Sequence, residues 1–380
     1  SRGGEGVVRA YDRIFDGTFT PTNYTLSDIV LVSSIAPTDF LGTNSANPHE
    51  VPYHLLYGSA DGDVCGCPDN DIADSFNLFE RALGWRASTY VHGADHNDFN
   101  CCGFNDFQGP ALTQIGRPEA QRVTKGAYLA LIKHRIEGNE AVREFLFRQY
   151  ESLRPIAVAP ATIVVNDLLE GTEGEVLVLD NYQTNTSTSV SSSGGAVTFS
   201  VENVVENKIN DLNTSFTWIA SDPFNGMTRG RTTDLARGVV FDYQAPSYYE
   251  LEVPAPMRDF TGWERLSLRA AQGTRHPRTT AELANLTFAV TLRDSKGVEN
   301  SINIGAYRGG VQEPYQRTGF GTGAGWQNEY EVIRIRLQDF QVDGVPIDLS
   351  DIVAVRLDFG VEGTSQVGRV SLDDIILVPH

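Results

Sequence analysis

Three short segments near the start of the chain carry the side chains that ester hydrolysis by a serine enzyme requires. The chain begins Ser1-Arg-Gly-Gly, and the segments YGSAD and HGADH follow, ending at Asp61 and His96. A serine hydroxyl becomes a useful nucleophile when a histidine accepts its proton, and a carboxylate can hold that histidine in the productive tautomer. We therefore predict that Ser1 is the nucleophile, that His96 is the general base and then the general acid, and that Asp61 orients the imidazole.

The predicted elements place these residues at the carboxyl edge of one parallel sheet. Short apolar runs, typical of strands buried on both faces, cover residues 28–35, 53–57 and 87–92. Apolar residues at helical spacing predict helices at 2–15, 72–83 and 118–137. Because strands alternate with helices, and the acid and the base each follow a strand, the sequence favours an α/β fold over residues 1–155.

Small residues after Ser1 suit a nucleophile on a tight turn between a strand and a helix. Gly3 and Gly4 stand where the backbone of such a turn packs closely. The backbone N–H of Arg2, the residue after the nucleophile, would then donate to the oxyanion that forms during acyl transfer.

With these motifs, residues 1–155 resemble the C-terminal part of α/β-hydrolase serine esterases, especially the dienelactone-hydrolase-like, cutinase-like and polyester-degrading groups. SRGG resembles the second half of the nucleophile motif, YGSADGDV the acid loop, and VHGADHNDF the histidine loop. The resemblance implies Asp61 as the acid, with Asp63 and the more remote Asp39 as alternatives. It implies His96 as the base, with His92 as the alternative.

The same resemblance implies that the strands before the nucleophile lie outside this chain. We expect a longer protein, or a separate chain that supplies the N-terminal half of the fold. The expected substrate is a carboxylic ester, small or polymeric, and the chemistry needs no cofactor. Phe40 and Phe99, on loops beside the predicted triad, would line an acyl pocket or pack beneath those loops.

Four cysteines lie in two clusters that follow the acid loop and the histidine loop. The first cluster is Cys65 and Cys67, and the second is Cys101 and Cys102. This spacing lacks the paired C-x-x-C motifs of a structural zinc site. We therefore predict a disulfide between the clusters, which implies a secreted or periplasmic location.

The composition changes after residue 155. The stretch with Pro155 and Pro160 has no helical period, so residues 156–172 predict a linker or a first edge strand, whereas residues 173–380 hold short alternating segments typical of an antiparallel β-sandwich. LDNYQ, EYEVIRIRLQDF and RVSLDDIILV resemble the jelly-roll carbohydrate-binding modules of secreted enzymes. That resemblance implies a polysaccharide partner and a structural calcium ion held by Asp180 and Asp373.

Aromatic side chains of the second domain predict either a platform for stacking sugars or ordinary core packing. They are Trp263, Trp326, Tyr248, Tyr249, Tyr307 and Tyr315. If they are core, the domain only packs against the first domain and shields it.

The composition also excludes some functions. A formal net charge of -19 opposes binding to nucleic acid or to an anionic membrane, and no apolar run is long enough to span a bilayer. Ester hydrolysis is the leading hypothesis. Two alternatives stay open, a carbohydrate- or surface-binding protein with an incomplete hydrolase remnant, and a peptidase or amidase that uses the same triad.

Overall fold

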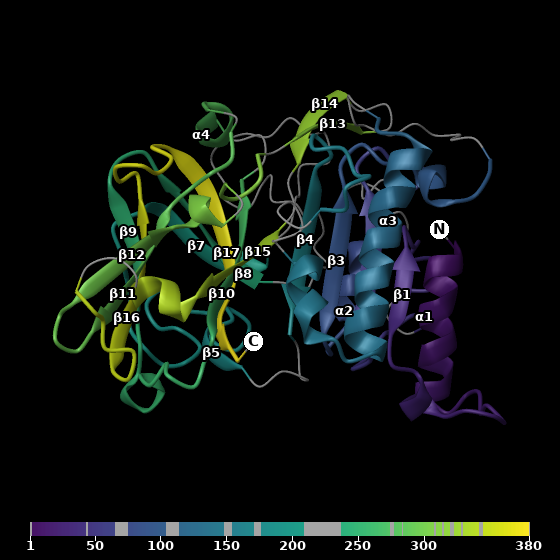
Figure 1. Cartoon of the computed structure of the whole chain (residues 1–380), viewed down its shortest axis with the longest axis horizontal. Helices are drawn as coiled ribbons and strands as arrows, with labels where there is room; N and C mark the ends of the chain where they lie inside the picture. The colour runs from purple at the N-terminus through teal and green to yellow at the C-terminus, as the bar shows by residue number, and fades with distance from the viewer. Residues whose placement is uncertain are drawn as a thin grey trace.

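The chain forms an α/β part followed by an antiparallel β-sandwich (Figure 1). The computed structural model describes residues 2–42, 45–64, 75–103, 114–147, 154–170, 176–208, 237–273, 277–282, 284–307, 309–313, 315–319, 323–327, 330–341 and 345–379. Among these residues, no helix is long and apolar enough to cross a membrane.

The α/β part is built on a four-stranded sheet in the order β1-β2-β3-β4. Strands β1, β2 and β3 run parallel, and β4 pairs antiparallel with β3. The strands are Val32–Ile35, Tyr53–Gly58, Arg86–Val91 and Val164–Leu169. The helices are α1 (Arg2–Phe15), α2 (Phe76–Arg81) and α3 (Arg117–Leu131), which continues as a π-helical turn over Ile132–Ile136.

Helices cover both faces of this sheet. Alternate residues of each strand point to opposite sides, so each face has its own apolar side chains to bury against a helix. On β2, Leu55 packs in one apolar cluster with Val8 of α1 and Phe79 of α2. Leu56 packs in another cluster with Val123 of α3. Every residue of β2 is buried, which explains why its sequence reads as a continuous apolar run.

The order of helices and strands in the first part agrees with the prediction, but its boundary does not. Helix α1 has the predicted bounds, and β2 and β3 differ from theirs by a residue. Residues 156–172, predicted as a linker, contain β4, whose six residues are all buried. The sequence left an edge strand open as the alternative to a linker, but it did not indicate that this strand would pair with β3.

The sandwich confirms the predicted antiparallel architecture. One sheet has the order β15-β10-β17-β8-β7, with β5 also paired to β17, and the other has the order β12-β11-β16-β9-β6. The first comprises Glu331–Arg336, Arg265–Gln272, Gly368–Val378, Arg237–Tyr243, Glu202–Lys208 and Leu177–Asp180. The second comprises Glu299–Asn303, Ala289–Asp294, Ile352–Phe359, Ser247–Glu252 and Val197–Phe199.

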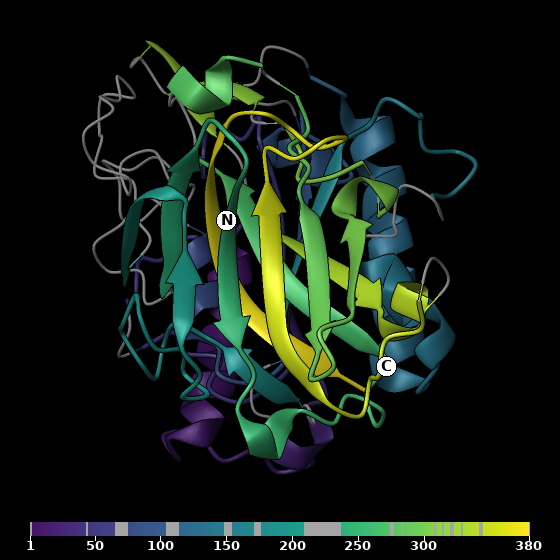
Figure 2. The same ribbon diagram turned by 90° about the vertical axis from the view of Figure 1, so that its left-hand side faces the viewer.

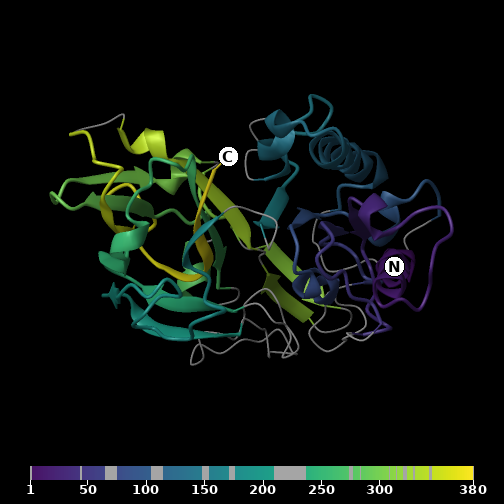
Figure 3. The ribbon, with the colours of Figure 1, turned by 90° about the horizontal axis from the view of Figure 1, so that it is seen from below.

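The two sheets enclose one large apolar core. Inward-facing residues of both contribute, including Leu268 of β10, Phe241 of β8, Leu292 of β11 and Leu357 of β16. A separate hairpin, β13 (Tyr315–Gly319) with β14 (Gly323–Gln327), stands outside these sheets. The view from below shows the sandwich and the α/β part side by side (Figure 3).

Buried charges join β4 to the first sheet of the sandwich. Arg269 of β10 donates from Nε and Nη2 to the two carboxylate oxygens of Asp167 on β4, at 2.7 and 2.6 Å, and from Nη1 to Asp373 of β17. All three side chains are at most 2% exposed. Nearby, Arg334 of β15 lies 3.2 Å from Glu170 Oε1. The α/β part and the first sheet of the sandwich therefore pack against each other through buried ion pairs.

Candidate active site

Asp61 lies just beyond the carboxyl end of β2, where the backbone turns beneath the loop that follows β3. Gly58 ends β2, and a Cβ placed there would lie 2.3 Å from the carbonyl oxygen of Ala94. Only glycine allows the two loops to approach so closely. The Asp61 side chain is 1% exposed, and its Oδ1 accepts backbone N–H groups of Asp63 at 2.9 Å and Val64 at 2.7 Å. These contacts fix the direction of the other carboxylate oxygen.

That second oxygen binds His96. Asp61 Oδ2 lies 2.7 Å from His96 Nδ1, so this nitrogen donates and Nε2 faces away from Asp61. His96 opens a short 3₁₀ turn over His96–Phe99 whose N-cap is Asp95, and the Asp95 carboxylate accepts the His96 backbone N–H at 2.7 Å. Both the ring and the backbone of His96 are thus held by carboxylates.

The buried surroundings of His96 also shift the pKa of the Asp95 carboxyl. Burial raises the pKa of Asp95 to about 6, with the carboxylates of Asp61 and Asp98 adding to the rise and the His96 N–H opposing it. Perturbed titratable groups of this kind cluster at functional sites, although structural networks produce them as well.

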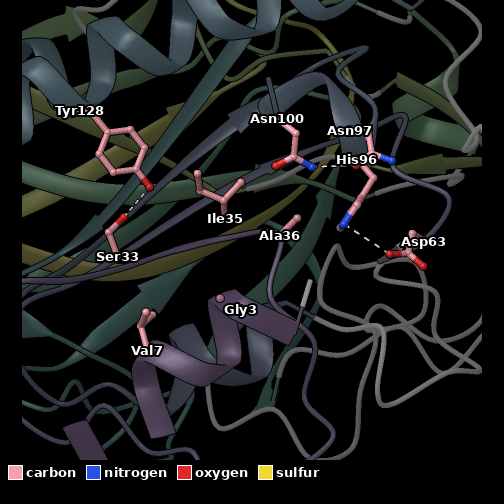
Figure 4. A pocket seen from close by; sticks show the side chains of 11 residues that line it. Gly3, Val7, Ser33, Ile35, Ala36, Asp63, His96, Asn97, Asn100 and Tyr128 are labelled. Carbon is pink, nitrogen blue, oxygen red and sulfur yellow. Dashed lines mark hydrogen bonds and ion pairs between the residues drawn. The ribbon is translucent and has the colours of Figure 1, made fainter. Parts of the chain in front are cut away.

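A cavity of about 540 Å³ opens beside His96 (Figure 4). It extends from the histidine loop along β1 to the start of α1. Its lining residues are Gly3, Gly4, Val7, Ser33, Ile35, Ala36, Asp63, His96, Asn97, Asn100 and Tyr128. The cavity therefore brings together the base and the first turn of the helix that directly follows Ser1 in the sequence.

The first turn of α1 packs tightly against the end of β1. A Cβ on Gly4 would lie 3.0 Å from Pro37 Cβ, and the Ser34 hydroxyl donates to the Gly4 carbonyl at 2.7 Å. The buried Glu5 carboxylate accepts the backbone N–H of Leu41 at 2.6 Å. Ser1 lies outside the described residues. Backbone N–H groups in a first helical turn have no partner within the helix, and they favour an anion there.

The alternative acid and base occupy other places. Asp63 lies on the far side of the ring, with Oδ2 3.3 Å from His96 Nε2, so it does not hold Nδ1. Asp39 pairs with Arg81 and accepts from Asn77 at 2.9 Å. His92 Nδ1 lies 3.4 Å from Ser59 Oγ, and burial lowers the pKa of this histidine. Of the acids considered, Asp61 is the one that binds His96 Nδ1, whereas Asp63 lies beside Nε2 and lines the cavity together with His96.

A second serine–histidine contact, missed in the sequence, borders the same cavity. Ser33 Oγ lies 3.0 Å from His54 Nδ1 and 2.8 Å from Tyr128 Oη, and His54 Nε2 lies 3.0 Å from Thr89 Oγ1. Burial lowers the pKa of His54 to about 3. A general base works best when its pKa lies near the working pH, so His54 is poorly suited to activate Ser33 near neutrality.

The predicted acyl-pocket residues do not line this cavity. Phe99 packs into the apolar cluster beneath α3, where burial of the ring is favourable. Phe40 is 47% exposed, and the Arg2 guanidinium lies over its ring at 5.1 Å from the centroid. Asn97 and Asn100 line the cavity instead and were missed, although their position directly after His96 could have indicated them.

The predicted bridge between the cysteine clusters is wrong for the second cluster. Cys101 and Cys102 form a disulfide with each other, so neither sulfur is available for another bond. Cys65 and Cys67 lie outside the described residues. The clustering correctly indicated disulfide chemistry, but spacing alone does not give the partner of each cysteine.

The predicted calcium ligands each have other partners. Asp373 accepts from the buried Arg269. Asp180 Oδ1 accepts backbone N–H groups of Tyr182 and Ser192, both at 3.1 Å. In the described part of the chain, ligand atoms cluster instead at Asp12, Asp16 and His49, a grouping the sequence did not suggest. His49 Nε2 there lies 2.8 Å from Asp12 Oδ1.

The predicted aromatic platform is not formed by the described side chains. Tyr249 is 1% exposed in the sandwich core, and Trp263 packs against that core. Tyr307 donates its hydroxyl to Asp339. Tyr248 is 36% exposed. The side chains of Tyr315 and Trp326 lie outside the described ones.

Comparison with known proteins gives fold likenesses of low similarity. No protein family and no curated protein matches the chain. The family 11 carbohydrate-binding module from Clostridium thermocellum, solved with a β-1,3-1,4-mixed-linked tetrasaccharide, is 10% identical with a TM-score of 0.27, covering 48% of this chain and 88% of that one. A CBM61 module solved with β-1,4-galactotriose is 15% identical with a TM-score of 0.23, covering 52% and 98%.

An enzyme also shows this likeness. The β-1,2-glucanase from Parabacteroides distasonis is 16% identical with a TM-score of 0.29, and the match covers 54% of this chain and 25% of the glucanase. The chain thus matches about a quarter of that enzyme's length. TM-scores of this size assign neither a ligand nor an activity to the present chain.

Proposed function

We propose that the α/β part belongs to a serine hydrolase of the α/β-hydrolase type that cleaves carboxylic esters. The observation that carries the proposal is the buried Asp61–His96 pair, 2.7 Å apart, beside a cavity that also contains Gly3 and Gly4. The residue that precedes this glycine-rich helix start is a serine. A serine, a histidine and a buried carboxylate are the three groups that acyl transfer through an acyl-enzyme uses.

In this reaction His96 Nε2 accepts the proton of the Ser1 hydroxyl as the serine oxygen bonds to the ester carbonyl carbon. The Asp61 carboxylate holds the Nδ1–H tautomer and stabilises the imidazolium that forms. The backbone N–H of Arg2, at the positive end of the α1 dipole, donates to the oxyanion. His96 then protonates the leaving alcohol, and water, deprotonated by the same histidine, releases the acid and restores Ser1.

The test is hydrolysis of short p-nitrophenyl esters together with covalent labelling by a fluorophosphonate. We expect both to be abolished by Ser1→Ala and by His96→Ala. Ser27→Ala is a suitable control, since Ser27 is exposed and lies outside the cavity. Labelling that persists in Ser1→Ala, or turnover that persists in His96→Ala, would contradict the proposal. Parallel assays with p-nitroanilides distinguish an esterase from an amidase.

A second candidate function, carbohydrate binding, is favoured by the open face of the second sandwich sheet. Figure 2 shows this sheet toward the viewer, with the α/β part behind it. Polar side chains cross it in a hydrogen-bonded row, and Arg356 forms paired bonds with Glu299 at 2.8 and 2.9 Å. Thr291 Oγ1 donates to Asp358 at 2.6 Å, and the partly exposed Tyr248 borders the row. Planar polar groups beside an aromatic ring suit the hydroxyls and faces of sugars.

Affinity electrophoresis in gels containing soluble polysaccharides tests this second function. We expect retardation of the whole chain that Tyr248→Ala and Arg356→Ala weaken, while Ser1→Ala leaves it unchanged. Equal mobility in gels with and without every polysaccharide tested would reject the binding role.

A further inference from the structure

Asp63 lies beside His96 Nε2, the nitrogen that must be accessible to the serine hydroxyl and the substrate in the proposed reaction. Its Oδ2 lies 3.3 Å from His96 Nε2, the nitrogen that faces away from Asp61. The Asp63 side chain is 45% exposed and lines the cavity (Figure 4), whereas Asp61 is 1% exposed behind the ring. The two aspartates therefore contribute differently, since one supports the imidazole from the interior and the other presents a carboxylate to whatever enters the cavity.

No lysine or arginine offsets this carboxylate among the described residues that line the cavity. The other polar side chains that line the cavity include the uncharged Asn97, Asn100 and Tyr128. At the start of α1, the Arg2 guanidinium lies over the exposed ring of Phe40. Behind the histidine, the carboxylates of Asp95 and Asp98 add further negative charge.

We propose that Asp63 contributes to substrate specificity by disfavouring esters that carry a carboxylate close to the scissile bond, so that neutral and cationic esters are the preferred substrates. The inference rests on the proposed hydrolase function and names its substrate class. A substrate whose acyl chain ends in a carboxylate must hold that charge beside Asp63 while the ester reaches His96. Two like charges about 7 Å apart in a solvent-exposed cavity repel enough to lower the specificity constant about threefold to eightfold.

A matched pair of substrates isolates this charge effect. In p-nitrophenyl valerate and mono-p-nitrophenyl glutarate the leaving group and chain length are the same, and a methyl group is replaced by a carboxylate. The quantity to measure is the ratio of kcat/KM for the neutral ester to that for the anionic ester, corrected by the ratio of their hydroxide-catalysed rates. A ratio of this kind cancels any effect of Asp63 on the chemical step that both esters share.

We expect the whole chain to prefer the neutral ester and Asp63→Asn to reduce the preference by about threefold to eightfold. Added salt should weaken the preference of the unaltered protein, because screening acts on exposed charges, and should have little effect on the variant. Asp351→Asn is the control, since Asp351 is 44% exposed in the sandwich, far from the cavity lining in sequence and absent from it. Its ratio should equal that of the unaltered protein.

The possible results distinguish a failure of the proposed role of Asp63 from a failure of the proposed hydrolase function. Hydrolysis of both esters that depends on His96 but shows a ratio unchanged by Asp63→Asn overturns the role of Asp63 and leaves the hydrolase intact. No His96-dependent hydrolysis of either ester overturns the proposed function and the inference together. A ratio that falls in Asp63→Asn and in Asp351→Asn alike would reflect net charge, and would also overturn the specific role of Asp63.

Discussion

Replacing Arg269 with alanine should destabilise the protein more than the loss of any exposed arginine. Arg269 is buried between the α/β part and the sandwich, with two hydrogen bonds to Asp167 and a third to Asp373. Its guanidinium also lies over the Tyr330 ring, 4.9 Å from the centroid. Arg269→Ala leaves two buried carboxylates without this partner.

The magnitude follows from burial rather than from the number of bonds. Removing one member of a buried ion pair leaves an uncompensated charge in a low-dielectric interior and costs about 3–5 kcal/mol. Burial already raises the pKa of Asp373 well above its usual range, even with Arg269 beside it. Without Arg269, Asp373 and Asp167 should take up protons more readily, so the loss of stability should shrink as the pH is lowered.

The assay is denaturant unfolding followed by tryptophan fluorescence and by circular dichroism, at neutral and at mildly acidic pH. Arg336→Ala is the matched control, because Arg336 is 49% exposed and pairs with Asp339 at 3.1 Å. Exposed pairs of this kind contribute about 0–1 kcal/mol. If Arg269→Ala costs no more than Arg336→Ala, or if its cost grows toward acidic pH, the reasoning about buried charge at this interface is wrong.

Three further predictions concern the site. Asp61→Asn should lower kcat on the order of ten-thousandfold, because an amide does not hold the Nδ1–H tautomer, and ester kinetics should show no such loss for Asp351→Asn. Asp95, whose pKa is raised to about 6, contributes stability that is present below about pH 4 and is lost as the pH rises through 6. Because Asp95 is buried and one pKa unit corresponds to about 1.4 kcal/mol, Asp95→Asn should abolish a loss of about 2–3 kcal/mol across that range, measured by urea unfolding. Gly58→Ala should destabilise by about 1–3 kcal/mol and slow ester hydrolysis, since its Cβ would meet the Ala94 carbonyl at 2.3 Å, whereas Gly262→Ala, with no atom within 4 Å, should leave both unchanged.

The sequence was informative where a local pattern determines the structure. The apolar run of β2 and the helical spacing of α1 depend on residues close together in the chain, and both elements lie where predicted. The chain order of Asp61 and His96, each after a parallel strand, placed their side chains at the same sheet edge, and the structure shows their contact. Their catalytic roles remain a prediction.

Features that depend on distant residues were not predictable in the same way. Asp167 and Arg269 are 102 residues apart, and neither has a neighbour in sequence that indicates burial beside the other. Tyr248 and Tyr249 are adjacent residues of the same type, but strand alternation places Tyr248 at the surface and Tyr249 in the core. The cavity residue Tyr128 belongs to a helix that meets β1 only in the folded chain, through Ser33.

The position of β4 also limits where recombination could divide the gene without disrupting either part of the protein. Strand β4 completes the sheet that carries the histidine loop, and its Asp167 pairs with Arg269 of the sandwich. A recombination that separated the chain before Val164 would remove the strand that pairs with β3, and one after Glu170 would leave the buried Asp167 without Arg269. We therefore expect the α/β part and the sandwich to be inherited together in one gene, and gene fusions that transfer only one of them to be rare.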